Sequence, residues 1–333
     1  MLSPFFPVGA AVWSGDLSGE HAALLKKHFV SITPENAMKW QFLRPSEGVF
    51  DFTQADALAA FAAENHLRMR GHTLVWHQQN PAWLFKDATG RELEANPADK
   101  RLLLERLRSH IRTVVSHYKD TVYAWDVVNE VIDPAQPDGF RRSRWFAITG
   151  TEYIDVAFRT AREASPGAEL FVNDYDTTNP AKRLYLLALV RDLKRRGVPV
   201  DAVGHQMHVH MDYPPIESFV ETVRMFSALG VDNQVTELDV SIYAGPGDKS
   251  SLAAVPPETL LRQGYRYRDL FAAFRSLKGQ LSGVTFWGLA DDHTWLRQHP
   301  FPRLDLPLPF DANFSPKFAY WGIVDPASLP PAP

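Results

Sequence analysis

The chain has 333 residues, 45% of them hydrophobic, which is enough for one large core or two smaller ones. Its formal net charge of -4 favours neither a nucleic-acid nor a membrane-surface partner, and the absence of cysteine excludes disulfides and thiol catalysis. No run approaches the ~18 apolar residues of a membrane span, and the stretch after Met1 lacks a basic leader and a small-residue cleavage site. We therefore expect a cytoplasmic protein that is a monomer or a weak homodimer.

Short apolar, β-prone runs alternate with runs of helical periodicity along the chain. Strands are predicted at 7–12, 29–33, 68–76, 169–172, 201–208 and 283–288, with two more that end at Glu130 and Asp239. Helices are predicted at 17–28, 53–66, 97–118, 152–164, 180–195, 215–229 and 257–277, with a weak terminal helix at 316–322. The proline-rich tail 326–333 is expected to fray.

Eight strand–helix units in succession predict an α/β fold, specifically a closed (β/α)8 TIM barrel of parallel strands. A doubly wound open sheet is the main alternative, but it calls for a glycine-rich phosphate turn after an early strand, and the sequence has none there. Because no low-complexity linker interrupts the series, we expect residues 1–333 to form a single catalytic domain.

Polar residues stand where the predicted strands end, and in a barrel those ends meet on the face that carries the active site. Glu130 and Glu237 each stand at the end of an apolar run. A retaining glycosidase uses two carboxyl groups about 5–5.5 Å apart, supplied by different elements. Asp239 shares a strand face with Glu237, so His208 held between the two would support an ionised nucleophile.

Other polar and aromatic residues allow more than one interpretation. His205, His208 and His210 invite a metal site with Asp239, although in a strand His205 faces away from the other two, and we predict no metal and no cofactor. Trp287 and Trp295 suit a sugar platform at the mouth of a carboxylate site, although a tryptophan considered alone is more often part of a core. Lys39, four residues after Glu35, fits either a helical ion pair or a sugar contact.

Seven stretches together give the sequence its resemblance to a known family. They are 33–40 (TPENAMKW), 70–77 (RGHTLVWH), 125–130 (WDVVNE), 172–175 (VNDY), 204–208 (GHQMH), 235–239 (VTELD), and 285–288 (TFWG) with 291–295 (DDHTW). In this order they resemble the endo-β-1,4-xylanases of glycoside hydrolase family 10, over roughly residues 8–326. The lack of a secretion signal resembles the intracellular members.

The resemblance implies hydrolysis of xylan or xylo-oligosaccharides, with Glu130 as the acid/base and Glu237 as the nucleophile, within a catalytic set completed by His208 and Asp239. It implies sugar contacts next to the cleaved bond from His72, Asn129, Gln206, His208 and Trp287. It implies contacts one sugar further towards the non-reducing end from Glu35, Asn36, Lys39, Trp76, Gln79 and Trp295. Tyr175 would lie on the leaving-group side.

Three other hypotheses remain open from the sequence. A related barrel glycosidase acting on a six-carbon glucan would use the same carboxylates. A metal-dependent hydrolase would use the three histidines and Asp239. A non-catalytic sugar-binding barrel is disfavoured, because a pure binder gains little from two adjacent buried charges.

Overall fold

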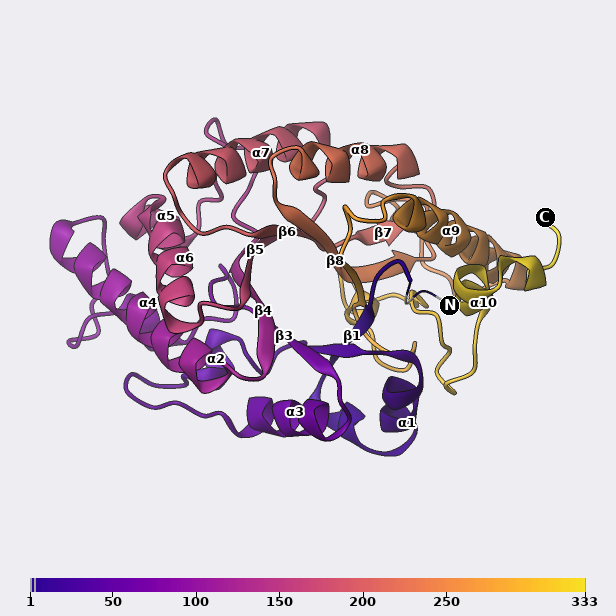
Figure 1. Cartoon of the computed structure of the whole chain (residues 1–333), viewed down its shortest axis with the longest axis horizontal. Coiled ribbons are helices and arrows are strands. Elements are labelled where there is room, and N and C mark those ends of the chain that lie inside the picture. The colour runs from indigo at the N-terminus through magenta and orange to yellow at the C-terminus, as the bar shows by residue number, and fades with distance from the viewer. Residues whose placement is uncertain (1, 3, 333) are drawn as a thin grey trace. The chain divides into compact units, whose positions relative to one another are not determined.

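The computed structural model of the chain describes residues 2 and 4–332 (Figure 1). Strands and helices alternate along this part of the chain, as the periodicity predicts. They form two compact units. The first unit comprises Met1–Ile32, Tyr175–Asn179 and His205–Pro333, and the second comprises Thr33–Asp174 and Pro180–Gly204.

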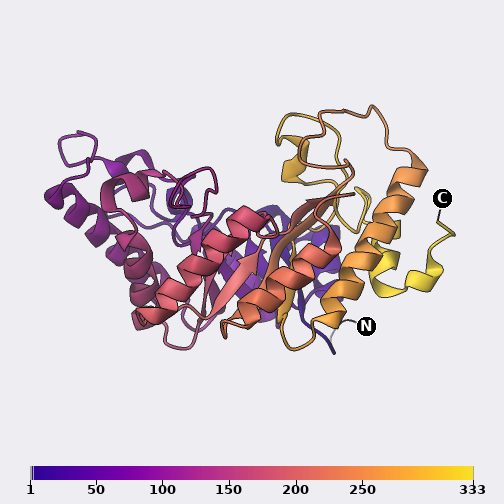
Figure 2. The ribbon, with the colours of Figure 1, turned by 90° about the horizontal axis from the view of Figure 1, so that it is seen from above.

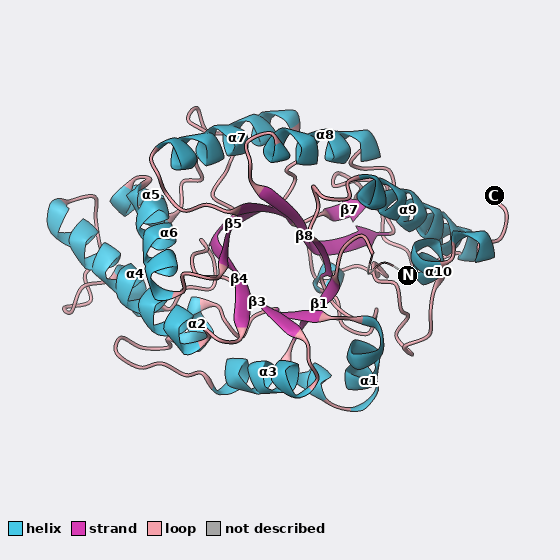
Figure 3. Ribbon diagram, in the orientation of Figure 1, coloured by secondary structure: helices cyan, strands magenta, loops and turns pink. Residues whose placement is uncertain are grey.

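Four parallel strands order the first unit. They pair in the sequence β1 (Val8–Val12), β9 (Gly283–Phe286), β8 (Asp232–Ser241) and β7 (His208–His210), drawn in magenta in Figure 3. Phe286 lies in register with Ala10 on one side and Leu238 on the other. Because all four strands run the same way, the residues that follow them collect at one edge of this sheet.

The helices of the first unit are α1 (Gly19–His28), α8 (Ile216–Ser227), α9 (Pro257–Ser276) and α10 (Phe318–Val324), with 3-10 turns η1 (Ser14–Leu17), η3 (Trp295–Arg297) and η4 (Pro326–Ser328). Figures 1 and 2 show α10 lying beside α9. The two helices approach closely because both carry glycine at the contact: a Cβ on Gly322 would lie 2.2 Å from the Gly264 carbonyl oxygen. Beyond them, the Tyr265 hydroxyl donates to the Pro330 carbonyl at 2.7 Å.

Parallel strands also order the second unit. β4 (Val122–Asn129) pairs with β3 (Arg68–His72) on one side and β5 (Glu169–Asp174) on the other. Ala124, Phe171 and Ala202 form a buried core cluster in it. Its helices are α2 (Trp40–Leu43), α3 (Thr53–Glu64), α4 (Pro97–His117), α5 (Arg144–Thr149), α6 (Glu152–Ala164) and α7 (Pro180–Arg195), with a 3-10 turn η2 at Ala82–Phe85. β2 (Ser31–Pro34) and β6 (Ala202–His205) each contain a unit boundary.

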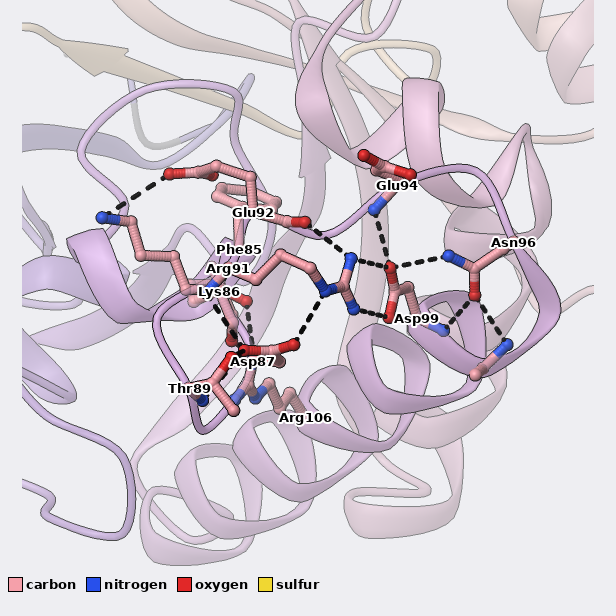
Figure 4. A network of polar contacts seen from close by, with 12 residues as sticks. Phe85, Lys86, Asp87, Thr89, Arg91, Glu92, Glu94, Asn96, Asp99 and Arg106 are labelled. Atoms are coloured by element: carbon pink, nitrogen blue, oxygen red, sulfur yellow. Dashed lines mark hydrogen bonds and ion pairs between the residues drawn. The ribbon is translucent and has the colours of Figure 1, made fainter.

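The start of α4 is fixed by a polar network (Figure 4). Asn96 caps the helix by accepting from the backbone amides of Ala98 and Asp99, and Pro97 occupies the first turn. Asp99 in turn accepts two hydrogen bonds from the Arg91 guanidinium, at 2.9 and 2.8 Å. The long segment between β3 and α4 is therefore attached to the helix it leads into.

Most predicted elements are confirmed, and the helices at 152–164 and 180–195 match to the residue. The strand predicted at 68–76 is too long, since β3 ends at His72. Beyond it the Leu74 amide and the Thr73 hydroxyl both bond to the Asp126 carbonyl, so the chain leaves the extended ladder. The strand predicted at 29–33 begins later, at Ser31.

The strand predicted at 201–208 is in fact two strands, β6 and β7. Met207 between them has φ of 63°, in the left-handed region that no strand continues through. β8 runs two residues past Asp239, whereas β9 stops at Phe286 and leaves Trp287 just beyond its end. α2 and α5 were not predicted, because four and six residues are too few to display helical periodicity.

Among the described residues, every helix falls short of the combined length and apolarity that crossing a bilayer requires.

Candidate active site

A histidine and two carboxylates are joined where β7 and β8 lie side by side in the first unit. The His208 ring donates through Nδ1 to Asp239 Oδ2 at 2.9 Å and through Nε2 to Glu237 Oε2 at 3.1 Å. Strand register explains this, since His208 pairs with Asp239 and Glu237 stands two residues earlier on β8. The predicted arrangement of His208 between the two carboxylates is confirmed.

The His208 imidazole carries a positive charge. Burial by itself would lower the pKa of His208, but the carboxylates of Asp239 and Glu237 outweigh it and raise that pKa to about 10. The ring is therefore a cation at neutral pH. A cation in hydrogen-bond contact with Glu237 favours the charged form of its carboxylate, which is the form a nucleophile needs.

Trp287 and Trp295 both lie against His208. Their ring centroids are 6.2 and 4.8 Å from the imidazole, each in an edge-to-face arrangement. The Trp295 indole N–H also donates to Asp239 Oδ2 at 2.8 Å. Trp287 is only 8% exposed. Both indole rings nevertheless contact His208, so the structure brings this predicted pair together with the histidine and its two carboxylates.

Two further predicted residues belong to the first unit. The Gln206 carbonyl accepts from the backbone amide of Glu237 at 2.9 Å, which ties the break between β6 and β7 to the Glu237 position. Tyr175 directly follows β5 and is 38% exposed. Its neighbour Asp176 accepts from the Tyr213 hydroxyl at 2.7 Å.

Glu130 lies one residue past β4 in the second unit, with φ of 57°. Its amide donates to the Asn173 carbonyl at 2.9 Å, and its own carbonyl accepts from Arg141 Nε at 2.6 Å. Left-handed backbone is costly for a residue with a Cβ and persists where surrounding bonds impose it. Arg141 is thus a direct support of Glu130.

His77, for which no role was predicted, is a neighbour of Glu130. Its Nδ1 lies 3.8 Å from Glu130 Oε2, and burial lowers the pKa of His77 to about 4 even though the Glu130 carboxylate opposes that shift. At neutral pH the ring is uncharged, in contrast to the His208 cation beside Glu237. The two glutamates therefore have different electrostatic surroundings.

Asn129 and His72 are held by buried partners in the second unit. Asn129 Oδ1 accepts from the Asn173 side-chain amide at 2.9 Å. His72 Nδ1 lies 2.9 Å from Asp126, which also forms an ion pair with Arg70 at 2.6 Å. Burial would raise the pKa of Asp126, yet the Arg70 charge and the His72 hydrogen bond keep it below its ordinary value. Both predicted sugar contacts thus have fixed orientations.

Four of the predicted contacts for the second sugar, Asn36, Lys39, Trp76 and Gln79, form one group in the second unit. Asn36 Oδ1 accepts from Lys39 Nζ at 3.0 Å and from Gln79 Nε2 at 3.2 Å. The Lys39 ammonium lies 4.7 Å from the centre of the Trp76 ring. The helical turn expected at Glu35–Lys39 is wrong: Lys39 precedes α2 in extended backbone, so these residues belong to a loop.

The metal interpretation is not favoured by the positions of its ligands. His205 uses both ring nitrogens on Thr177 and Asn233, at 2.8 and 3.0 Å, and is fully buried. His208 is occupied by the two carboxylates described above. Within residues 2 and 4–332, no group of three or more His, Asp or Glu side chains is arranged to hold a metal ion.

The charge on His208 makes the stability of the protein depend on pH. Its pKa is raised above the unfolded value of about 6.5, so the stabilisation is complete below pH 6.5 and is lost as the pH rises to about 10. We expect His208→Asn to lower the free energy of unfolding by about 3 kcal/mol at pH 6 and by much less at pH 10. Urea denaturation at both pH values measures this, with the exposed His66→Asn as control. An equal loss at the two pH values would contradict it.

The fold and the two residue sets define a glycoside hydrolase on a (β/α)8 barrel. A sequence profile of Glycosyl hydrolase family 10 matches residues 1–326, and the chain belongs to this family. It is 47% identical over 334 residues to endo-1,4-beta-xylanase A of Halalkalibacterium halodurans, an alignment that covers 96% of this chain and 84% of that protein.

Solved structures agree with this assignment. The crystal structure of xylanase B from Clostridium stercorarium F9 matches with a TM-score of 0.95 at 46% identity, covering 98% of each chain. A mutant of TsXylA, an intracellular xylanase from Thermoanaerobacterium saccharolyticum JW/SL-YS485, in complex with xylotetraose matches with a TM-score of 0.86 at 38% identity, covering 97% of this chain and 96% of that one. The predicted family and barrel fold are confirmed. The single domain over 1–333 and the roles of individual residues stay predictions.

Proposed function

We propose that the chain is a retaining endo-β-1,4-xylanase in which Glu237 is the nucleophile and Glu130 the acid/base. Membership of a glycoside hydrolase family supports the reaction class. The single observation that carries the assignment is the hydrogen bond between the His208 cation and Glu237, because it keeps one carboxylate charged in a buried site. The Glu130 carboxyl, whose Oε2 lies 3.8 Å from Nδ1 of the uncharged His77, takes the acid/base role that remains once Glu237 is the nucleophile.

The reaction proceeds in two displacements. Glu130 donates its proton to the glycosidic oxygen as the bond from that oxygen to the anomeric carbon breaks, while a Glu237 oxygen bonds to the same carbon. A water molecule then loses a proton to Glu130 and attacks the anomeric carbon, which releases Glu237 as a carboxylate. Two inversions leave the anomeric configuration unchanged. His208 and Asp239 hold the nucleophile in place throughout.

The remaining predicted residues would bind the sugar chain. Asn129, fixed by Asn173, would hydrogen-bond the 2-hydroxyl of the sugar being cleaved, a contact that strengthens in the transition state. His72, Gln206 and Trp287 would contact the same unit. Glu35, Asn36, Lys39, Trp76, Gln79 and Trp295 would contact the next unit, and Tyr175 the leaving group.

The substrate is proposed to be xylan or xylo-oligosaccharides rather than a six-carbon glucan. The named relatives are an endo-1,4-beta-xylanase, a xylanase and a xylanase mutant bound to xylotetraose. Xylose lacks the exocyclic hydroxymethyl group of glucose, and a site built for the smaller ring rejects the larger one by collision. A cytoplasmic location and a monomer or weak homodimer remain part of the proposal, since one relative is an intracellular xylanase.

Initial rates on linear xylan and on a soluble β-glucan, measured side by side with product analysis, test this function. We expect kcat/KM on xylan to exceed that on the glucan by about 100-fold, in line with the 1–3 kcal/mol that one extra carbon group is worth. Xylo-oligosaccharides of increasing length should be cleaved internally with β-configured products. Faster cleavage of the glucan would replace xylan with glucan as the substrate, and no cleavage of either would refute the proposal.

A further inference from the structure

Trp13 stands at the edge of the first unit where Trp287 follows β9. It directly follows β1, which pairs with β9, and β9 pairs with β8, the strand that carries Glu237. Neighbouring strands are about 4.8 Å apart, so Trp13 follows a strand that lies roughly 10 Å from β8. Across the sheet the order is β8, which carries Glu237, then β9, which Trp287 follows, then β1, which Trp13 follows.

The Trp13 ring is held in a fixed position. It stacks on His293, with ring centroids 5.5 Å apart and planes inclined by 24°. It also covers Gly15, where an added Cβ would lie 2.3 Å from the indole, so only glycine permits this placement. The Trp13 backbone amide donates to Asp16 at 2.9 Å. His293 belongs to the loop that leads from Trp287 to Trp295, which connects the stacked pair to the site residues.

The ring is nevertheless open to solvent. Trp13 is 45% exposed, whereas Trp40, Trp125 and Trp145 are at most 2% exposed. A single exposed apolar side chain needs no special explanation. An exposed indole that is already held in place is different. Little further conformational entropy is lost when a flat apolar face of a ligand binds to it.

Polar groups border the stacked pair. His21 Nε2 lies 2.8 Å from Asp292 and 3.7 Å from Asp16, and the side chains of His21 and Asp292 are 22% and 29% exposed. Both acidic residues lie next to the stacked rings in sequence, Asp16 three after Trp13 and Asp292 one before His293. An aromatic surface bordered by carboxylates and imidazole matches a sugar unit, which has apolar C–H faces and hydroxyls around its rim.

We infer that Trp13 and His293 bind a third xylosyl unit, one further towards the non-reducing end than the unit in contact with Trp295. This inference rests on the proposed xylanase function and extends it by one binding position. It assigns the loop after β1 a role in selecting chain length. Because the contact is remote from the reacting carbon, it contributes to kcat/KM only when the substrate is long enough to reach it.

Two aryl glycosides isolate this position. 4-Nitrophenyl β-xylobioside fills two sugar positions when the aryl group leaves, and the corresponding xylotrioside fills three. We expect Trp13→Ala to lower kcat/KM for aryl release from the xylotrioside about three- to tenfold and to leave the xylobioside within about twofold of wild type. Trp13→Phe should retain most of the xylotrioside activity, since it keeps an aromatic ring.

Trp321→Ala is the matched control, because Trp321 is a similarly exposed indole, 39%, on α10. It should change neither rate, and melting temperatures establish that each variant is folded. An equal fall on both substrates, or no change on the xylotrioside, would overturn the inference. If the wild-type enzyme releases the aryl group from neither substrate, the failure belongs to the proposed function, and the inference falls with it.

Discussion

Replacing Glu237 by alanine is expected to lower the hydrolysis of xylo-oligosaccharides by roughly 10⁴-fold or more, as removal of a covalent nucleophile does elsewhere. The side chain sits on β8 in contact with the His208 cation, so its loss removes both the attacking oxygen and the charge that balances the imidazolium. Steady-state rates on xylotetraose measure the loss.

Small anions provide the decisive part of this experiment. The cavity left by Glu237→Ala should admit azide or formate beside His208, and the anion should attack the anomeric carbon in one displacement. The product with azide would be the α-configured glycosyl azide, because only one inversion occurs. Glu258→Ala, which removes an exposed carboxylate on α9, should keep wild-type rates. Near-normal turnover by Glu237→Ala would remove this residue from the mechanism.

Replacing Glu130 by alanine should have an effect that depends on the leaving group. General acid catalysis contributes about 10²–10⁴-fold, so kcat/KM on xylo-oligosaccharides should fall by that amount. A 2,4-dinitrophenyl β-xylobioside needs little proton assistance to lose its aryl group, and its kcat/KM should fall less than about tenfold. A plot of log kcat/KM against leaving-group acidity measures the difference and should be steeper for the variant than for wild type.

Azide distinguishes this variant from the first. Without Glu130 no general base assists the water that hydrolyses the glycosyl-enzyme, so this step becomes slow. Azide needs no such base, so it should raise kcat and yield the β-configured glycosyl azide after two inversions. Glu163→Ala, a surface carboxylate of α6 whose side chain is 63% exposed, serves as the control. If the slope is unchanged, or if the product is the α-azide, Glu130 is not the acid/base.

Local patterns were sufficient for much of the fold. The helices at 152–164 and 180–195 were predictable to the residue because each has a sustained apolar period and clear end signals. The arrangement of His208 between Glu237 and Asp239 was also predictable, since alternation along β8 puts both carboxylates on one face. The strand predicted at 201–208 failed because nothing in its composition reveals that Met207 adopts left-handed backbone.

The sequence by itself determined the order of the elements, the family and the polar residues that close each strand, because these follow from periodicity and short motifs. Only the tertiary structure decided what surrounds them: that His77 and Arg141 support Glu130, and that Trp13 stacks on His293. Those partners are 53, 11 and 280 positions apart in the chain. Contacts at such separations depend on how strands pair and loops fold back, for which no local pattern carries the information.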